Sequence, residues 1–180
     1  MKLGQPDSDF DDIDLHILAL LQENCKLPLA KIGEKVGLSA PSVIERIKKL
    51  EDHEVIIGYR AIVNARRLGK DVTAFIGVSI NHPKLIDEFE QDIARLDDVL
   101  ECHHVTGQHT LLLKVKTHST SSLEDLISTI RSIEGVDRTE TMVVLSTHSE
   151  RTHVSVQYDA TPATKRSRRN GEKHVQLKGA

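Results

Sequence analysis

Residues 36–51 read VGLSAPSVIERIKKLE, and this stretch decides the fold of the first part of the chain. Gly37 tolerates the left-handed backbone that ends a helix, and the Ser39 hydroxyl can cap the free amides that begin the next one. Pro41 fits the first turn of that helix because its missing N–H has no helical partner there. We therefore predict a helix that ends before Gly37, a tight turn, and a second helix over residues 40–53.

Apolar spacing extends this helical region towards the N-terminus. Residues 10–24 place apolar side chains at helical intervals (Ile13, Ile17, Leu20, Leu21) behind a capping Asp11, and residues 29–36 form a short helix with three inward side chains (Ala30, Ile32, Val36). In the helix over 40–53, the expected buried stripe is Val43, Ile47 and Leu50, which leaves Ser42, Glu45, Arg46 and Lys49 on the other face. Two short helices joined by a glycine turn are typical of the helix-turn-helix, whose second helix enters the major groove of DNA.

The rest of the chain predicts a second, α+β domain. The β-branched residues of 55–63 indicate a strand that leaves the head, and 64–71 read as a linker. The pattern then runs strand, helix, strand, strand, helix, strand, over 72–80, 83–96, 100–105, 110–116, 121–133 and 138–146. This βαββαβ order predicts a ferredoxin-like antiparallel sheet with both helices on one face. The predicted domains are 1–63, 72–158 and a basic, disordered tail over 159–180.

Composition narrows the class of protein. The chain has 180 residues, 38% of them hydrophobic, and lacks an apolar run long enough to cross a bilayer, so we expect a soluble, cytoplasmic protein without a membrane partner. The two cysteines, Cys25 and Cys102, lie far apart and outside any C-x-x-C pair, which disfavours a disulfide or a zinc cluster. Adjacent strand residues point to opposite faces, so His103 and His104 cannot share one metal ion with His109. We expect no metal, no cofactor and, without a nucleophile or phosphate-loop motif, no enzymatic activity.

Charge is segregated along the chain although the net charge is only -3. Residues 31–70 hold nine Lys/Arg and five Asp/Glu, residues 71–150 hold six and fourteen, and residues 151–180 hold seven and two. Cationic patches gain affinity for DNA by releasing its counterions, so this distribution favours a phosphate-facing head on an acidic body. A surface whose charges are distributed at random is the alternative that charge alone leaves open.

Five sequence blocks in the same order resemble the leucine-responsive and asparagine regulator family, also called the feast/famine regulators. The blocks are FDDIDLHILALLQEN at 10–24, VGLSAPSVIERIKKLE at 36–51, VIIGYRA at 55–61, ECHHVTG at 101–107 and RTETMVVL at 138–145. The resemblance implies a transcriptional regulator with a winged-helix-like DNA-binding head and a ferredoxin-like domain that binds an effector and assembles the protein. Family members pair as dimers, which often form octameric rings.

The resemblance also implies which residues bind. The DNA-binding set on the second helix of the motif is Ser39, Ala40, Pro41, Ser42, Glu45, Arg46, Lys48 and Lys49. We expect Ser42, Arg46 and Lys49 to face the major groove, with Ser39 and Lys48 nearer the phosphates. The family binds an amino acid between dimers, and the corresponding residues here are Gly107, Gln108, His109 and Thr110, with Thr139 and Thr141 on the last strand.

Two departures from the family pattern bear on function. The family usually has Asp where this chain has Thr110, and a neutral hydroxyl pairs less strongly with an α-ammonium group than a carboxylate does. Pro28 stands where the family often has a Ser or Thr cap, and it can begin a helix without capping it. An architectural DNA-binding protein that needs no effector is therefore the main alternative, and a small enzyme or metabolite-binding module is the third.

Overall fold

The computed structural model describes residues 9–158, so the predicted tail over 159–180 lies outside the described residues. The chain divides into two units. The head unit comprises residues 9–60 together with 151–158, and the sheet unit is Ala61–Glu150. Sequence reasoning assigned 151–158 to the second domain because the segment follows its last strand. The structure places it with the head, because its hydrogen bonds are made to the first helix.

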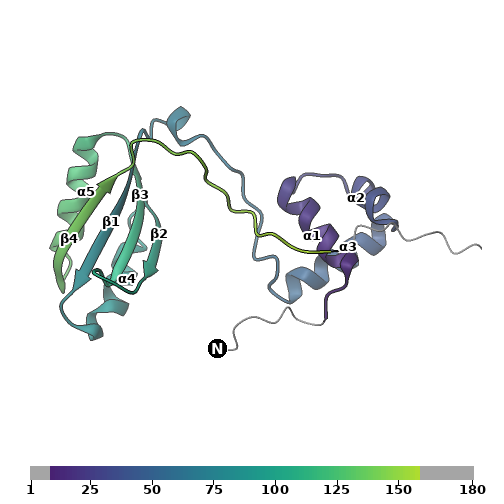
Figure 1. Ribbon diagram of the computed structural model, residues 1–180, viewed down its shortest axis with the longest axis horizontal. Coiled ribbons are helices and arrows are strands. Elements are labelled where there is room, and N and C mark those ends of the chain that lie inside the picture. Colours follow the sequence, from purple (N-terminus) through teal and green to yellow (C-terminus); the bar gives the residue numbers. More distant parts are fainter. Residues whose placement is uncertain (1–8, 159–180) are drawn as a thin grey trace, which may run out of the picture. The chain divides into compact units, whose positions relative to one another are not determined.

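The head unit contains the three predicted helices, α1 (Asp12–Glu23), α2 (Leu29–Val36) and α3 (Ala40–Asp52) (Figure 1). The predicted caps are present: the Asp11 carboxylate accepts from the Asp14 N–H, Gly37 adopts φ 75°, and the Ser39 hydroxyl accepts from the Ser42 N–H. The predicted inward side chain of Ala30 is wrong, because Ala30 lies exposed in the first turn of α2. The buried hydrophobic cluster of the unit is aliphatic: Ile17, Leu20, Leu21, Ile32, Val36, Val43 and Leu50.

The strand predicted over 55–63 is absent from the structure. These residues follow α3 as irregular backbone, and the side chains of Ile57 and Ile62 are 89% and 91% exposed. A strand exists only when its backbone groups pair with a neighbour, and among the described residues none pairs with this segment. The β-branched composition alone therefore does not make 55–63 a strand within the described residues.

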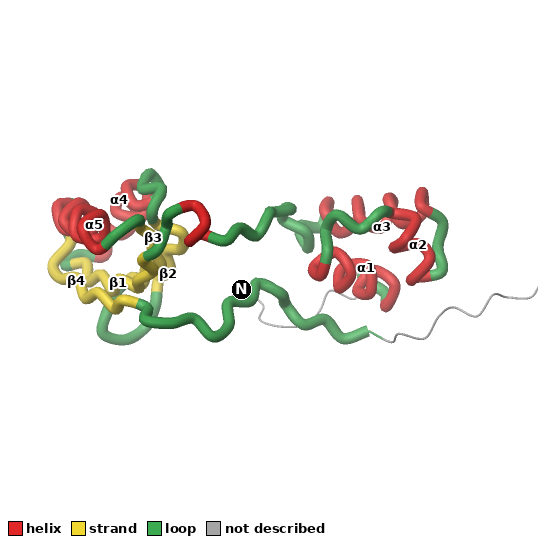
Figure 2. The backbone as a smooth tube through the Cα atoms, turned by 90° about the horizontal axis from the view of Figure 1, so that it is seen from above, coloured by secondary structure: helices red, strands yellow, loops and turns green. Residues whose placement is uncertain are grey.

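The sheet unit follows the predicted βαββαβ order, and the predicted ferredoxin-like fold is confirmed. Its elements are β1 (Val72–Ile80), a 3-10 turn (Pro83–Leu85) leading into α4 (Ile86–Ile93), β2 (Val99–His104), β3 (Leu111–Thr117), α5 (Thr120–Ser132) and β4 (Val136–Val143). The strands are all antiparallel in the order β2-β3-β1-β4. The predicted linker contains a 3-10 turn, Ala65–Leu68. Figure 2 shows both helices on one side of the sheet.

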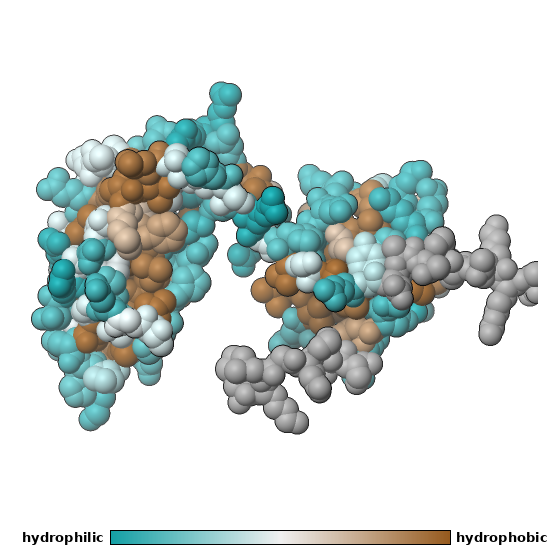
Figure 3. Space-filling view, in the orientation of Figure 1, coloured by the Kyte–Doolittle hydropathy of each residue, from teal (hydrophilic) through white to brown (hydrophobic). Residues whose placement is uncertain are grey.

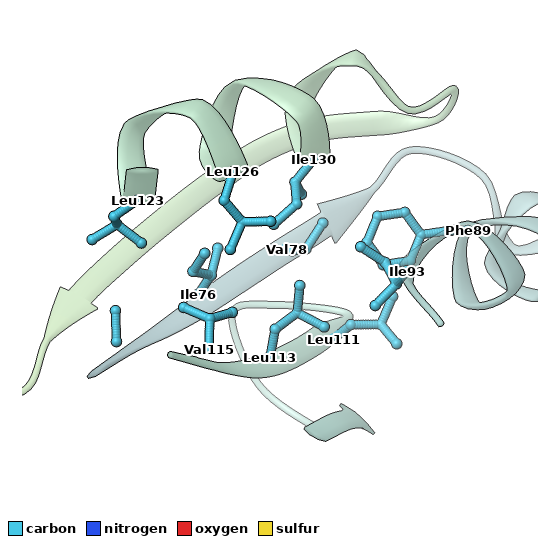
Figure 4. Close-up of a cluster of buried hydrophobic side chains, with 11 residues drawn as sticks. Ile76, Val78, Phe89, Ile93, Leu111, Leu113, Val115, Leu123, Leu126 and Ile130 are labelled. Atoms are coloured by element: carbon cyan, nitrogen blue, oxygen red, sulfur yellow. The ribbon is translucent and has the colours of Figure 1, made fainter. Parts of the chain in front are cut away.

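The core of the sheet unit lies between that face and the two helices. Alternate residues of β1 and β3 point into it, together with Phe89 and Ile93 of α4 and one side of α5 (Figure 4). Its buried members are Ala74, Ile76, Val78, Phe89, Ile93, Leu111, Leu113, Val115, Leu123, Leu126 and Ile130. The opposite face carries Phe75, which is paired in register with Met142, and Leu112, paired with Gly77. Apolar side chains gather over the sheet in Figure 3, so one chain leaves apolar surface uncovered.

No helix within residues 9–158 is long and apolar enough to span a membrane.

Candidate DNA-binding helix and effector loop

One stripe of α3 is open to solvent. Pro41, Ile44, Glu45 and Lys48 are all exposed, and their spacing of three, four and seven residues places them on one face of the helix. Ile44 is 50% exposed although it is a large aliphatic residue. Ser39 precedes the helix and is also exposed, so the capped N-terminus of α3 and this stripe form one accessible surface.

Arg46 and Lys49 lie on a different face, against α1. The Arg46 guanidinium donates at 2.7 Å to Asp14 Oδ1 and at 2.7 Å to Asp11 Oδ1. Lys49 Nζ donates at 3.0 Å to Asp14 Oδ2 and also reaches the backbone oxygen of Asp9. The Asp14 carboxylate is fully buried, so both of its oxygens are paired with a cation.

This arrangement differs from the free polar face expected for Ser42, Arg46 and Lys49. Arg46 is only 28% exposed and is occupied by two carboxylates, while the Ser42 hydroxyl is bonded to that of Ser39 at 2.9 Å. A buried carboxylate is costly unless it is paired and hydrogen-bonded, which is why two cations of α3 turn inwards. The pair of helices is thus fixed by ionic contacts as well as by apolar packing.

The charges around Asp11 tune its acidity. Burial acts to raise the pKa of Asp11, but the hydrogen bonds from the Asp14 N–H and from Arg46 outweigh it and hold the pKa below its usual value of 3.8. For Arg46, partial desolvation acts to lower the pKa, and the two carboxylates more than reverse this and raise it. Both groups therefore remain charged at neutral pH.

Sequence reasoning missed the role of Asp14, although a signal was present. Asp14 precedes Ile17 by three residues and Leu21 by seven, so it occupies a position of the apolar stripe of α1. A carboxylate at an inward position requires a buried cation, and the nearest helix with suitably spaced cations is α3.

The predicted effector loop follows β2 and leads into β3. Gly107 has φ +125°, a backbone conformation that favours glycine, and Gln108 is exposed. The His109 ring turns back over the sheet and fills the space above Gly77, where an added β-carbon would lie 2.4 Å from the ring. His109 Nε2 is 3.3 Å from Glu140 Oε2, whereas its buried Nδ1 has no hydrogen-bond partner among the described residues.

Two of the three threonines of the predicted site have side-chain hydrogen-bond partners within the chain. Thr110 Oγ1 accepts from the Ile80 N–H at 3.1 Å, and Thr139 Oγ1 accepts from Arg131 Nε at 2.8 Å. Thr139 and Thr141 pair with Val78 and Ile76, which point towards the helices.

The predicted site is consequently split between the two faces of the sheet. Glu140 lies beside Gly77 on the uncovered face, and His109 packs there. Residues paired directly across antiparallel strands point to the same side, so Thr139 and Thr141 lie on the helix side. The structure thus brings His109 of the loop beside Glu140, and it places the two threonines of β4 on the other face of the sheet.

One histidine of β2 lies beside a carboxylate of its own strand. His103 Nε2 lies 3.3 Å from Glu101 Oε2, and Glu101 also accepts from Lys114 at 3.1 Å. These hydrogen bonds, from Lys114 and then His103, hold the pKa of Glu101 below its usual value. Within residues 9–158, no three His, Cys, Asp or Glu side chains converge as metal ligands would.

Comparison with known proteins covers both units. Residues 10–51 match the AsnC-type helix-turn-helix domain, and residues 73–154 match the Lrp/AsnC ligand binding domain. The HTH-type transcriptional regulator FL11 of Pyrococcus furiosus is 34% identical over 146 residues, which cover 81% of this chain and 96% of that protein. The leucine-responsive regulatory protein of Klebsiella pneumoniae is 31% identical, with 78% and 88% covered.

Solved structures agree with this assignment. The AsnC structure from E. coli superimposes with a TM-score of 0.75 at 30% identity, covering 80% of this chain and 97% of that one. A transcriptional regulator of Neisseria meningitidis, solved as a complex with L-methionine, gives a TM-score of 0.78 at 28% identity, with 81% and 96% covered. With the helix-turn-helix and the ferredoxin-like sheet both matched, the chain belongs to the Lrp/AsnC family of DNA-binding transcriptional regulators.

Proposed function

We propose that this regulator reads DNA with the exposed stripe of α3, namely Pro41, Ile44, Glu45 and Lys48, inserted in the major groove. Ser39, Ala40 and Ser42 form the N-terminus of the helix, where hydroxyls and partial positive charge suit a phosphate. The observation that carries this proposal is the inward position of Arg46 and Lys49. These two cations hold α3 on α1, so the stripe on the open side is the surface left for base edges.

Single substitutions can separate the side chains that contact DNA bases from those that hold α3 against α1. Lys48→Ala and Glu45→Ala should each weaken binding to an operator selected by the wild type, by about 1–3 kcal/mol where the side chain contacts a base. Lys84→Ala, on the sheet unit, is the charge control. Fluorescence anisotropy with duplex DNA gives the affinities. If Lys48→Ala and Glu45→Ala both keep full affinity while a folded Arg46→Ala variant loses affinity, Arg46 contacts the bases and this proposal is wrong.

The effector of this regulator is, in our proposal, an amino acid or another small molecule bound at residues 107–110. The Neisseria relative is described in complex with L-methionine, and a feast/famine protein of M. tuberculosis likewise. In this chain, the hydroxyl of Thr110 already accepts a backbone hydrogen bond, and His109 fills the space above Gly77. We therefore expect weak binding of ordinary amino acids, accompanied by a turn of the His109 ring that gives Nδ1 a partner.

Restoring charge at position 110 tests the site. Thr110→Asp should bind amino acids more tightly than the wild type, since charge-assisted hydrogen bonds are roughly twice as strong as neutral ones. The matched control is Thr110→Asn, which keeps the acceptor and lacks the charge. Calorimetry with each amino acid measures the affinities. Tight wild-type binding that survives simultaneous replacement of Gln108, His109 and Thr110 by alanine would place the effector elsewhere.

Assembly is the third element of the proposal. The uncovered sheet face around Phe75, Leu112 and Met142, and the exposed segment 55–63, offer apolar surface that a second copy can bury. The partner's segment would also supply the missing strand pairing of 55–63. Pairing would place two heads about one turn of DNA, roughly 34 Å, or a multiple of it apart. Light scattering at micromolar concentration should show a dimer or a larger ring, and a monomer would contradict this.

An architectural role without an effector is the second candidate, and the internally satisfied Thr110 favours it. The two functions differ in a thermal-shift screen, because a ligand that binds the folded state raises the apparent stability. An effector-dependent regulator shifts with at least one of the common amino acids. A protein that shifts with none of them and still bridges two DNA duplexes is architectural.

A further inference from the structure

The sheet unit contains a polar cleft that lies outside both the DNA-reading helix and the loop at 107–110. Its volume is about 310 Å³, which falls in the range of roughly 300–1,000 Å³ that is usual for small-molecule sites. Thr73 and Lys116, which are paired in register at one end of β1 and β3, belong to its lining. Two connecting stretches complete the cleft: residues 63–71, before β1, and residues 144–150, after β4.

The first of these stretches is held in place by hydrogen bonds of its own. Asn64 caps the 3-10 turn by accepting from the Arg67 N–H at 3.3 Å. The Lys70 N–H closes the turn by donating to the Ala65 carbonyl at 2.9 Å. The side chain of Arg66, which lines the cleft, is therefore carried by a fixed turn of backbone.

The second stretch folds back onto the uncovered face of the sheet. The Val144 N–H donates to the Thr73 carbonyl at 2.9 Å, which continues the pairing of β1 past the end of β4. Further along, the Glu150 carboxylate is bound by Lys114, and Lys116 Nζ lies 3.4 Å from its second oxygen. The hydrogen bond from Lys114 holds the pKa of Glu150 below its usual value of 4.5, so this carboxylate is charged at neutral pH.

The cations of the cleft differ in how far they are already engaged. Lys70 forms an ion pair with Asp98. The contact of Lys116 with Glu150 is long, and Glu150 keeps Lys114 as its partner if Lys116 turns to a ligand. Arg66 forms no ion pair with any other residue that the structure describes. Arg66 and Lys116 are therefore the two cations available to a ligand.

The chemistry of the lining favours a ligand with one negative charge. A guanidinium group binds a carboxylate through two parallel hydrogen bonds, so the two groups match in geometry as well as in charge. The hydroxyls of Thr73, Ser146 and Thr147 offer donors and acceptors to the rest of a small polar acid. The lining holds three cations and two carboxylates, a net charge of +1: Arg66, Lys70, Lys116, Asp71 and Glu150.

We propose that this cleft binds the carboxylate group of a small organic acid, with Arg66 as its two-pronged partner and Lys116 as the second cation. The site does not depend on the function proposed above. Its two connecting stretches are also the segments of chain that lead to the head unit, because the units divide after residues 60 and 150. A bound acid therefore holds the two connections together at the sheet unit.

Calorimetry with the full chain tests the site. The probes are pyruvate and lactate, two small monocarboxylic acids, and inorganic phosphate is the comparison anion. The wild type should bind at least one of the acids saturably and more tightly than phosphate. Arg66→Ala should lower this affinity about tenfold or more, because charge-assisted hydrogen bonds are lost. The matched control is Arg67→Ala, which removes the same side chain from the same turn but outside the lining, and should leave the affinity unchanged.

Hydrogen exchange by mass spectrometry locates the bound acid. Residues 61–71 and 144–150 should exchange more slowly when the acid is present, whereas residues 107–110 should not change. Arg66→Lys keeps the charge and loses the planar pair of donors, so its affinity should lie between those of the wild type and Arg66→Ala. Lys116→Gln should also weaken binding, while Glu150 stays paired with Lys114.

Three results would overturn the inference. If neither acid binds saturably, the cleft is not a carboxylate site. If phosphate binds as tightly as the acids, the cleft holds an adventitious ion only. If Arg66→Ala and Arg67→Ala weaken binding equally, or if the acid protects residues 107–110 instead, the acid binds elsewhere. DNA affinity and amino-acid binding are measured separately, so each of these results leaves the proposed function in place.

Discussion

The two units of this regulator hold their helices in place by different means. In the sheet unit, eleven buried apolar residues fill the space between sheet and helices, and the one polar residue found buried within residues 61–150 is Thr117. In the head unit, seven aliphatic residues are joined by a fully buried carboxylate, Asp14, with two cations from α3. Apolar packing is non-directional, whereas ion pairs require defined geometry.

The difference has a functional meaning. The assembly and effector binding that we propose for the sheet unit would need a stable platform, which a close-packed core provides. DNA reading needs one helix at a fixed rotation about its own axis, and the bonds of Asp14 to Arg46 and Lys49 specify that rotation for α3. The same bonds leave Arg46 and Lys49 less exposed, so the defined orientation of α3 comes with less free positive charge on that face of the helix.

The largest expected effect lies in the sheet core. Phe89→Ala removes a fully buried aromatic ring between α4 and the sheet and should reduce the free energy of unfolding by about 3–5 kcal/mol. Urea unfolding measures the loss, and hydrogen exchange locates it. Protection should fall in β1 and β3 and persist in α1 and α3. An equal loss of protection in the head would show that the two cores are one cooperative unit.

The next effect is in the head, where a cation is removed from the buried carboxylate. Arg46→Ala leaves Lys49 as the one cation on Asp14 among the described residues and should cost about 1–3 kcal/mol, because the charged acceptor loses one of its partners. Lys48 lies on the exposed face of the same helix, so Lys48→Ala should change the free energy of unfolding by less than about 0.5 kcal/mol. A double-mutant cycle that combines Arg46→Ala with Asp14→Asn should give a coupling energy above about 0.5 kcal/mol. Strictly additive effects would show that the ion pair does not contribute to stability.

Gly33 and Gly77 each leave no room for a β-carbon, but one is blocked by rigid backbone and the other by a side chain that can move. A β-carbon at Gly33 would lie 2.5 Å from the Leu38 carbonyl oxygen, and backbone in the helix-turn-helix cannot move aside. Gly33→Ala should therefore destabilise the head by about 1–3 kcal/mol. At Gly77 the obstacle is the His109 ring, which can swing out, so Gly77→Ala should cost less than about 1 kcal/mol. Thermal unfolding measures both, and the cost at Gly77 should disappear in a His109→Ala background.

The smallest effect concerns pH. The folded-state pKa of Asp11 is lowered, so ionised Asp11 stabilises the head above the usual value of 3.8, and this stability is lost as the pH falls through the lower folded-state value. Asp11→Asn should flatten the dependence of head stability on pH between about 5 and 2. Thermal unfolding followed over that range is the measurement. A mutant profile that still falls as steeply as the wild type would assign the acid sensitivity to other carboxylates.

Most of the fold was accessible from the sequence because its signals are local. The caps at Asp11 and Ser39, the left-handed turn at Gly37 and the alternation in β1 each depend on residues within a few positions of one another. The prediction of a strand over 55–63 is wrong because that structure depends on contacts that are not local. Its composition is local, but its existence depends on a pairing partner, which the described residues of one chain do not provide.

The directions of the candidate site side chains were less accessible from the sequence than the fold, since side-chain direction depends on neighbouring elements. Helical spacing places Arg46 and Lys49 on a polar face, and it took the buried Asp14 of another helix to turn them inwards. The same holds for the effector loop, where the sequence grouped Thr139 with His109 although the sheet register sends them to opposite faces.

The sequence by itself determined the order of the elements, the helix-turn-helix, the ferredoxin-like sheet and the family, because periodicity, caps and turn residues act over short distances along the chain. Only the tertiary structure decided which face of α3 is open, where the ring of His109 lies, and that residues 151–158 return to α1. Each of these depends on a contact between residues remote in sequence. The free energy of such a contact comes from burial and pairing, and no short stretch of sequence encodes either.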